Sequence, residues 1–309
     1  MFNFKKYLCT KDITFNEVTD RWLDYKYNSI KQSTYFKYKY IIEKYLFPSL
    51  KDKTLKQLLY FDFNNYICSF YTLNKSTLKL LITILKSILK FAERKYDLDF
   101  KTDLIKFPKK YSSNLQIFTD KEKRKLIQYC YNENSLKSIG ILISLYTGIR
   151  IGELCALKWK NINLKEDTIT ITKTLQRVYE NNGTHILIDS PKSYSSIRKI
   201  PINKKLHNLL YALNEINNYN KESYFLTGLT DKFIEPRNYQ YTFKNILQKI
   251  QLPIYNFHIL RHTFATDCIS INMDVKSLSK ILGHSNVNIT LNKYVHPSFE
   301  DTKIYLEKI

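Results

Sequence analysis

The chain has 309 residues, enough for about two domains that each bury a core of their own. Its 49 Lys and Arg residues outnumber 28 Asp and Glu residues, for a net charge of +21. Residues 1–110 hold 22 basic and 11 acidic residues and residues 111–309 hold 27 and 17, so both halves share the excess. A basic surface on two globular halves favours a polyanion, first of all nucleic acid. An AT-rich genome, which inflates Lys, Asn, Ile and Tyr, would explain part of the same charge.

The cysteines and the apolar segments exclude several protein classes. None of the five cysteines forms a Cys-x-x-Cys pair, which argues against a metal site and against a disulfide framework. The N-terminus lacks the apolar core of a signal peptide. The most apolar segments, 139–146 and 78–91, are too short or too charged to span a bilayer. We therefore expect a cytoplasmic protein that does not enter a membrane.

Residues 1–107 carry four patterns with helical spacing. The first begins at the capping box of Thr14 and Glu17, the second ends at Pro48, the third spans 61–70, and the fourth follows Asn74. The apolar stripe of the fourth helix consists of Leu78, Leu81, Ile82, Leu85, Ile88 and Leu89. Its lysines lie off that stripe. The pattern predicts a helical bundle with basic outer faces.

A linker is predicted over residues 108–117, where Pro, Ser and basic residues are mixed without periodicity. A second capping box, Thr119 with Glu122, opens a second domain over residues 118–309. Strands are expected over 168–172, 185–188 and 197–202, and the turn Asn-Asn-Gly precedes the second of them. The fold class is therefore mainly α with a small antiparallel β-sheet (α+β).

Arg150 lies between two of the six glycines of the chain, Gly148 and Gly152. These glycines permit a sharp turn between helices that leaves the arginine at the junction. Taken alone, the stretch is more typical of a helical hairpin with a surface arginine.

The last fifty residues carry side chains suited to a phosphate. His258 and Arg261 are three positions apart, so both can leave one helical face toward one point. Arginine clamps phosphate oxygens in a fork, and histidine donates a hydrogen bond. Leu282-Gly283-His284 then supplies a second imidazole in a turn, and Tyr294 follows ten residues later in a polar run. This order indicates phosphoryl transfer through a tyrosine.

The ordered set resembles the tyrosine recombinase (phage integrase) family. The resemblance implies a SAM-like core-binding domain over 1–107 and a catalytic domain over 118–309. It also implies Glu153 as a support for Arg150, and a catalytic lysine in the β-hairpin, where Lys192 matches best. Lys173 and Lys199 are rivals for that role. Because about a dozen residues precede Thr14, we expect no arm-binding domain and a simpler, Xer-like organisation, encoded by a bacterium, phage or mobile element.

The family resemblance also implies a mechanism without metal, cofactor or ATP. Tyr294 would attack a phosphate of duplex DNA, giving a 3′-phosphotyrosine and a free 5′-hydroxyl. Arg150 and Arg261 would offset charge on the phosphate, and His284 would donate to the same oxygens. His258 would take the phenol proton, and Lys192 would protonate the leaving oxygen. His262 would point elsewhere on the helix, so we interpret it as structural.

The expected partners are double-stranded DNA with a specific recombination site, a homo-tetramer in synapsis, and accessory DNA-bending proteins. A tail helix over 296–309 would dock on a neighbouring protomer or pack on its own domain. Two alternatives remain open: a type IB topoisomerase, which religates the same strand, and a non-enzymatic DNA-binding regulator on an integrase scaffold. Integration, excision and resolution are not distinguished.

Overall fold

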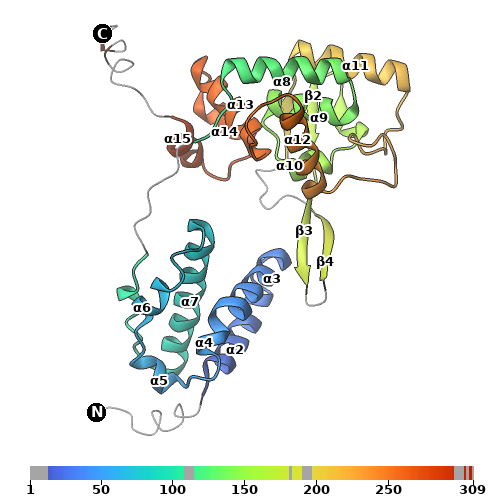
Figure 1. Ribbon diagram of the computed structural model, residues 1–309. Helices are drawn as coiled ribbons and strands as arrows, with labels where there is room; N and C mark the ends of the chain where they lie inside the picture. The colour runs from blue at the N-terminus through green and yellow to red at the C-terminus, as the bar shows by residue number, and fades with distance from the viewer. Residues whose placement is uncertain are drawn as a thin grey trace. The chain divides into compact units, whose positions relative to one another are not determined.

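The computed structural model describes residues 13–107, 115–180, 183–189 and 197–295, together with 303, 306 and 307. The chain divides into two compact units (Figure 1). The N-terminal unit comprises residues 1–113 with 178–184, and the C-terminal unit comprises residues 114–177 with 185–309. The division at residue 113 falls inside the segment that we interpret as the linker. Within the described residues, no helix combines the length and apolar character needed to cross a membrane.

The N-terminal unit is helical, and its helices begin where the sequence places side-chain caps. Thr14 Oγ1 accepts a hydrogen bond from the Glu17 amide, and Asn74 Oδ1 accepts one from the Thr77 amide. These caps satisfy amides that have no partner inside the helix. The elements are α2 (Phe15–Tyr27), α3 (Gln32–Ile41), η1 (Ile42–Leu46), α4 (Phe47–Leu50), α5 (Leu55–Leu59), α6 (Phe63–Cys68), α7 (Lys75–Tyr96) and η2 (Thr102–Leu104).

The sequence pattern predicted that Pro48 ends the second helix, and this prediction was wrong. After α3 the chain continues through one π-helical segment, η1, into the short α4, which runs on to Leu50. Pro48 lies in the first turn of α4, where a missing N–H costs nothing. The π-helical segment separates α3 from this new start. A further capping box at Thr54 opens α5, which the sequence analysis missed.

The core of the N-terminal unit forms around α7. The six apolar residues of its predicted stripe are all buried. Each buried leucine or isoleucine contributes about 1.5–3 kcal/mol relative to an exposed one. Trp22 of α2 stacks on Tyr38 at a ring-centroid distance of 5.8 Å, and its indole N–H donates to Ser87 Oγ at 3.1 Å. The aromatic spacing of α2 and α3 is therefore a core pattern.

The C-terminal unit surrounds α9, which is buried along almost its whole length. Gly140 permits this packing, because a Cβ there would lie 2.5 Å from Leu226 and 2.6 Å from the Tyr239 hydroxyl. The helices are α8 (Asp120–Glu133), α9 (Leu136–Thr147), α10 (Ile151–Cys155), η3 (Trp159–Asn161), α11 (Lys204–Asn217), α12 (Pro236–Lys249), α13 (His258–Ser270), α14 (Val275–Leu282) and α15 (Val287–Tyr294).

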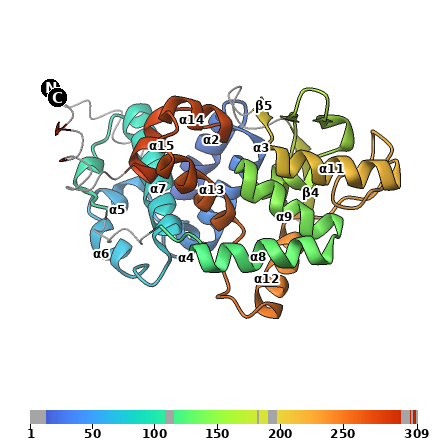
Figure 2. The same ribbon diagram turned by 90° about the horizontal axis from the view of Figure 1, so that it is seen from above.

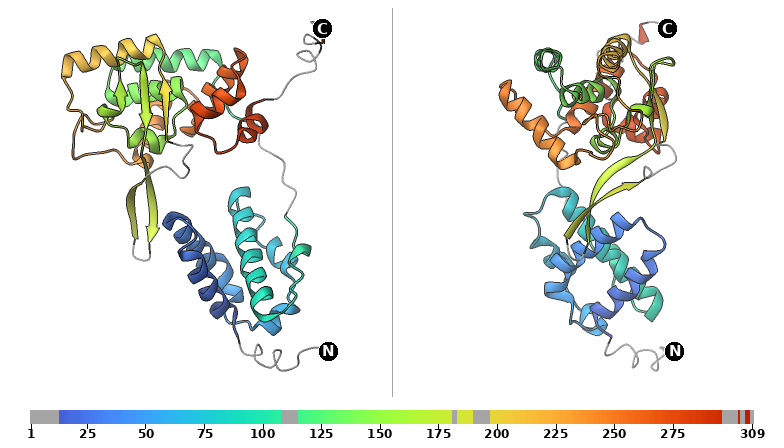
Figure 3. Two further views of the ribbon diagram at one scale, coloured as in Figure 1. Left: turned by 180° about the vertical axis from the view of Figure 1, so that it is seen from behind. Right: turned by 90° about the vertical axis from the view of Figure 1, so that its right-hand side faces the viewer.

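The strands form two small sheets. The first has the order β1-β2-β5, and its pairs are antiparallel. The second pairs β3 with β4 as a two-stranded ribbon (Figure 3). The strands are β1 (Ile162–Asn163), β2 (Thr168–Ile171), β3 (Thr174–Glu180), β4 (Gly183–Asp189) and β5 (Arg198–Pro201). The mainly α fold class is confirmed, but β1 and β3 were not predicted, because neither has the alternation of a half-buried strand.

Candidate active site

Five of the six predicted catalytic residues lie in the described part of the C-terminal unit. Arg150 is the N-cap of α10, His258 is the first residue of α13, and Arg261 follows one turn later. His284 follows the end of α14, and Tyr294 is the last residue of α15. Helices α13, α14 and α15 lie side by side (Figure 2). Lys192 lies outside the described residues.

Two turns that contain glycine accept hydrogen bonds from the predicted catalytic arginines. Gly148 ends α9 with φ +65° and Gly283 ends α14 with φ +64°, the left-handed conformation that favours glycine. Arg261 donates to the Gly148 carbonyl at 2.8 Å and to the Leu282 carbonyl at 2.8 Å. Arg150 donates to the Gly283 carbonyl at 3.2 Å. Both guanidinium groups therefore bind the turn at the end of α14, and Arg261 also binds the turn that precedes Arg150, which fixes the two arginines relative to each other.

Glu153 is the buried carboxylate of the site, and Arg198 is a partner that the sequence analysis missed. Arg198 donates to both Glu153 oxygens, at 3.0 and 2.9 Å, and Arg150 Nη1 donates to Oε1 at 2.9 Å. Burial alone would raise the pKa of Glu153, but Arg198 first and then Arg150 hold it below its ordinary value. Arg198 and Ile200 are both buried on one face of β5, and this alternation was the available signal.

Tyr294 is nearly enclosed, with 6% of its surface exposed. Its hydroxyl lies 2.8 Å from Nδ1 of His262, and the two ring centroids are 5.7 Å apart. The interpretation of His262 as pointing elsewhere was therefore wrong. Because α13 turns by about 100° per residue, the side chains of Arg261 and His262 point in different directions. Helix α15 packs beside α13, however, and its Tyr294 contacts His262.

The two predicted catalytic histidines have different surroundings. His284 Nδ1 lies 2.8 Å from the hydroxyl of the fully buried Thr290, which fixes the ring. Burial, then Arg261 and Arg150, lower the pKa of His284 to about 4. The His258 ring packs edge-on against the His262 ring, with centroids 4.5 Å apart. The pKa of His258 is also lowered, by desolvation first and then by His262 and Arg261.

Positive charge is in excess at this site. Within the described part of the chain, four cations, Arg150, Arg198, Arg261 and Lys293, act on these groups against the single carboxylate of Glu153. Burial first, and then the charge of Arg150, lower the pKa of Arg261 to about 9. The surroundings therefore suit a phosphate, whose negative charge would relieve the repulsion.

Of the lysines weighed against Lys192, Lys199 has a surface role. Its ammonium pairs with Glu166 at 3.1 Å, and both side chains are more than half exposed. Such exposed pairs contribute little to stability. Lys173 is also exposed. Neither has the buried surroundings of Arg150, Arg198 and Arg261.

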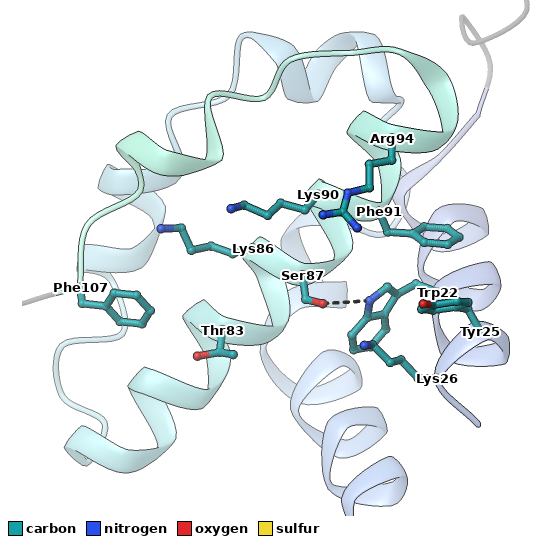
Figure 4. Close-up of a pocket in the computed structure, with 10 residues that line it drawn as sticks. All are labelled: Trp22, Tyr25, Lys26, Thr83, Lys86, Ser87, Lys90, Phe91, Arg94 and Phe107. Atoms are coloured by element: carbon teal, nitrogen blue, oxygen red, sulfur yellow. Dashed lines mark hydrogen bonds between the residues drawn. The ribbon is translucent and has the colours of Figure 1, made fainter. Parts of the chain in front are cut away.

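The N-terminal unit carries a groove between α2 and α7 with a volume of about 570 Å³ (Figure 4). The α2–α7 groove is lined by Trp22, Tyr25, Lys26, Thr83, Lys86, Ser87, Lys90, Phe91, Arg94 and Phe107. Four of these ten residues are basic and four are aromatic. Lys26 lies 5.5 Å from the ring centroid of Tyr25, and Lys86 lies 5.4 Å from that of Phe107. Interleaved cations and aromatic rings are typical of nucleic-acid surfaces.

Known proteins resemble the chain along most of its length. It is 27% identical over 317 residues to a tyrosine recombinase XerC-like protein of Caldanaerobacter subterraneus subsp. tengcongensis, covering 93% of this chain and 80% of the relative. The integrase of transposon Tn1549, solved with circular intermediate DNA, matches with a TM-score of 0.76 at 22% identity, over 96% of this chain and 99% of that one. A lambda integrase tetramer bound to a Holliday junction matches with a TM-score of 0.64 at 15% identity, over 93% and 80%.

Two family models match the sequence directly. The model of the phage integrase N-terminal SAM-like domain matches residues 14–67, within the helical N-terminal unit. The model of the phage integrase family matches residues 116–301, which contain every predicted catalytic residue. The chain therefore belongs to the phage integrase family and is a tyrosine-type site-specific recombinase, an enzyme that cuts and rejoins DNA.

Proposed function

We propose that Tyr294 cuts duplex DNA at a specific site, forming a 3′-phosphotyrosine and a free 5′-hydroxyl. The 5′-hydroxyl of a partner strand then attacks the phosphotyrosine and rejoins the DNA. One observation carries this assignment: an enclosed phenol lies in the field of two arginines that are held rigidly and are in excess over carboxylate. A phosphate bound by these arginines would relieve their repulsion and would lie beside the phenol, which could then attack it.

Arg150 and Arg261 would bind the equatorial oxygens of the scissile phosphate. Their bonds to turn carbonyls and to Glu153 hold the guanidinium planes before DNA arrives, so little reorganisation is needed as charge develops. The Arg150 side chain is 35% exposed, so it would contact the phosphate from the solvent side. Metal ions perform this neutralisation in many phosphoryl transferases. With the two arginines in that role, the reaction requires no metal or ATP.

The remaining roles divide among two histidines, His284 and His258, and Lys192. His284, oriented by Thr290, would donate a hydrogen bond to the same phosphate oxygens. His258 begins α13 beside this position and would contact the phosphate from its exposed side. Lys192 would protonate the departing 5′ oxygen, a role that rests on its place in the sequence between β4 and β5.

Duplex DNA would be held by both units. The α2–α7 groove supplies basic and aromatic contacts from the N-terminal unit, and the excess of positive charge extends over both halves of the chain. The lambda integrase that this fold resembles was solved as a tetramer on a Holliday junction. That likeness supports a homo-tetramer in synapsis, with strands exchanged between protomers. Religation of the same strand, the topoisomerase outcome, would need only one protomer.

The covalent intermediate provides the test. Incubation with a suicide substrate nicked near the cleavage point should give a protein–DNA adduct that survives a denaturing gel, also in EDTA. Tyr294→Phe removes one oxygen and keeps the ring, so DNA affinity should persist while the adduct is lost. Peptide mapping should place the DNA on Tyr294. An adduct on another tyrosine would overturn the assignment, and a wild type without any adduct on its own recovered site would favour a regulator.

A further inference from the structure

The hydroxyl of Tyr294 lies within hydrogen-bond distance of a histidine to which the sequence analysis gave no catalytic role, and Arg261 contacts it as well. His262 lies on α13, and its Nδ1 is 2.8 Å from the Tyr294 oxygen at the end of α15. The two rings are tilted by 54°, with centroids 5.7 Å apart. At this distance a proton can pass directly between the two atoms, without an intervening water.

His258, which we expected to take the phenol proton, has different neighbours. Its ring meets the His262 ring edge-on at 4.5 Å, so His262 lies beside both His258 and the tyrosine. Taken as a whole residue, His258 at the start of α13 is also more exposed than His262. This arrangement suits contact with an incoming phosphate for His258 and contact with the nucleophile for His262.

Burial, together with the charges around it, keeps the His262 ring neutral. Burial, then Lys293 of α15 and Arg261 of α13, lower its pKa to about 4. The other elements packed on α13 contribute titratable groups too: α14 carries Lys276 and Lys280, α8 carries Lys123, and α9 carries Tyr146. Lys123 is paired with Asp267, further along α13. A neutral ring whose Nε2 carries the proton offers its Nδ1 lone pair to the phenol.

The phenol itself needs such a partner. Burial raises the pKa of Tyr294 above its ordinary value, although Arg261 and Arg150 act to lower it. Free phenolate is therefore scarce at neutral pH, and attack must be coupled to proton removal. A general base in direct contact contributes about 10²- to 10⁴-fold to such a step.

We propose that Nδ1 of His262 is the general base that accepts the Tyr294 proton, an inference that rests on Tyr294 being the nucleophile. The phenol O–H bond breaks and its proton moves to Nδ1 while the phenol oxygen forms a bond to phosphorus. The bond from phosphorus to the 5′ oxygen breaks, and that oxygen takes a proton from the general acid, which we assign to Lys192. In rejoining, the imidazolium of His262 returns its proton to the departing phenol oxygen.

The test is the pH profile of single-turnover cleavage by the full-length protein. The substrate carries sulfur at the bridging 5′ position, so protonation of the leaving group no longer affects the rate. Wild type should show a level rate above about pH 6, because His262 is neutral there. His262→Asn keeps a hydrogen-bond acceptor near the position of Nδ1 but cannot take the proton. Its rate should be lower by about 10²-fold at pH 7 and rise about tenfold per pH unit up to pH 9.

His258→Asn is the matched control, because it removes the neighbouring imidazole from the same helix. Its rate should fall while its profile stays level. A level profile for His262→Asn would overturn the proposal and leave His262 as a positioning residue, and a rising profile for His258→Asn would return the role to His258. His262→Gln replaces His262→Asn should the latter not fold. Failure of the proposed function is distinguishable, since wild type would then form no adduct on Tyr294.

Discussion

The two units carry nearly equal excesses of positive charge but place them differently. Within the described part of the N-terminal unit, the buried residues are apolar apart from Thr19 and Thr102, and every Lys and Arg reaches the surface. The C-terminal unit buries Glu153, Arg198 and Arg261. Surface charge of the first kind attracts DNA and is screened by salt, whereas the second kind is desolvated and fixed in geometry. The comparison suggests that one unit contributes affinity and the other contributes chemistry.

The largest expected effect comes from Arg261→Lys in the C-terminal unit. The charge is kept, but the fork that joins Gly148 and Leu282 is lost, and with it the fixed contact to the phosphate. We expect single-turnover cleavage at saturating DNA to fall by about 10³-fold, with less than about a tenfold change in affinity. The freed carbonyl should lower the free energy of unfolding by about 1–3 kcal/mol.

Arg124→Lys serves as the control for this substitution, because Arg124 is exposed on α8. It should alter neither cleavage nor stability. If Arg261→Lys weakened DNA binding as much as it slowed cleavage, Arg261 would be a binding residue and the division of labour between the units would fail.

An intermediate effect is expected from the buried ion pair. Arg198→Met leaves Glu153 enclosed with Arg150 as its remaining cation, and losing one partner of a buried pair costs about 3–5 kcal/mol. Arg177→Met is the matched control, since Arg177 pairs with Glu235 at 2.7 Å on a partly exposed surface. That loss should cost less than about 1 kcal/mol. Chemical denaturation of both variants measures the difference, and equal costs would show that burial of Arg198 adds nothing.

The smallest effect should come from the N-terminal unit. Lys26→Ala with Arg94→Ala removes two cations from the α2–α7 groove. Each lost phosphate contact should lower the slope of log affinity against log salt by about 0.9. Cleavage at saturating DNA should be unchanged, because the reacting groups lie in the other unit. Lys160→Ala, which removes an ammonium paired with Glu222 at 2.8 Å, is the control. A slower cleavage step in the double variant would contradict the assignment of affinity alone to this groove.

Local physical rules were sufficient for much of the molecule. Capping residues such as Thr14, Asn74 and Thr119 are recognisable because their partners lie three positions away, and a helix periodicity such as that of α7 is written in one continuous segment. The glycine turns beside Arg150 and His284 are local as well, since left-handed backbone strongly favours glycine. The sequence by itself therefore determined the helices that carry such local signals, the α+β class, and the order of the candidate catalytic residues.

Tertiary structure decided which of these residues meet. His262 and Tyr294 are 32 positions apart, and Arg198 and Glu153 are 45 apart. Both pairs join separate elements, α13 to α15 and β5 to α10, and neither contact is implied by spacing along the chain. The same packing placed the His258 ring against His262 and enclosed Arg261. Residue types and order identified a phosphoryl-transfer site, but non-local packing determined which imidazole contacts the nucleophile and which arginine holds the buried carboxylate.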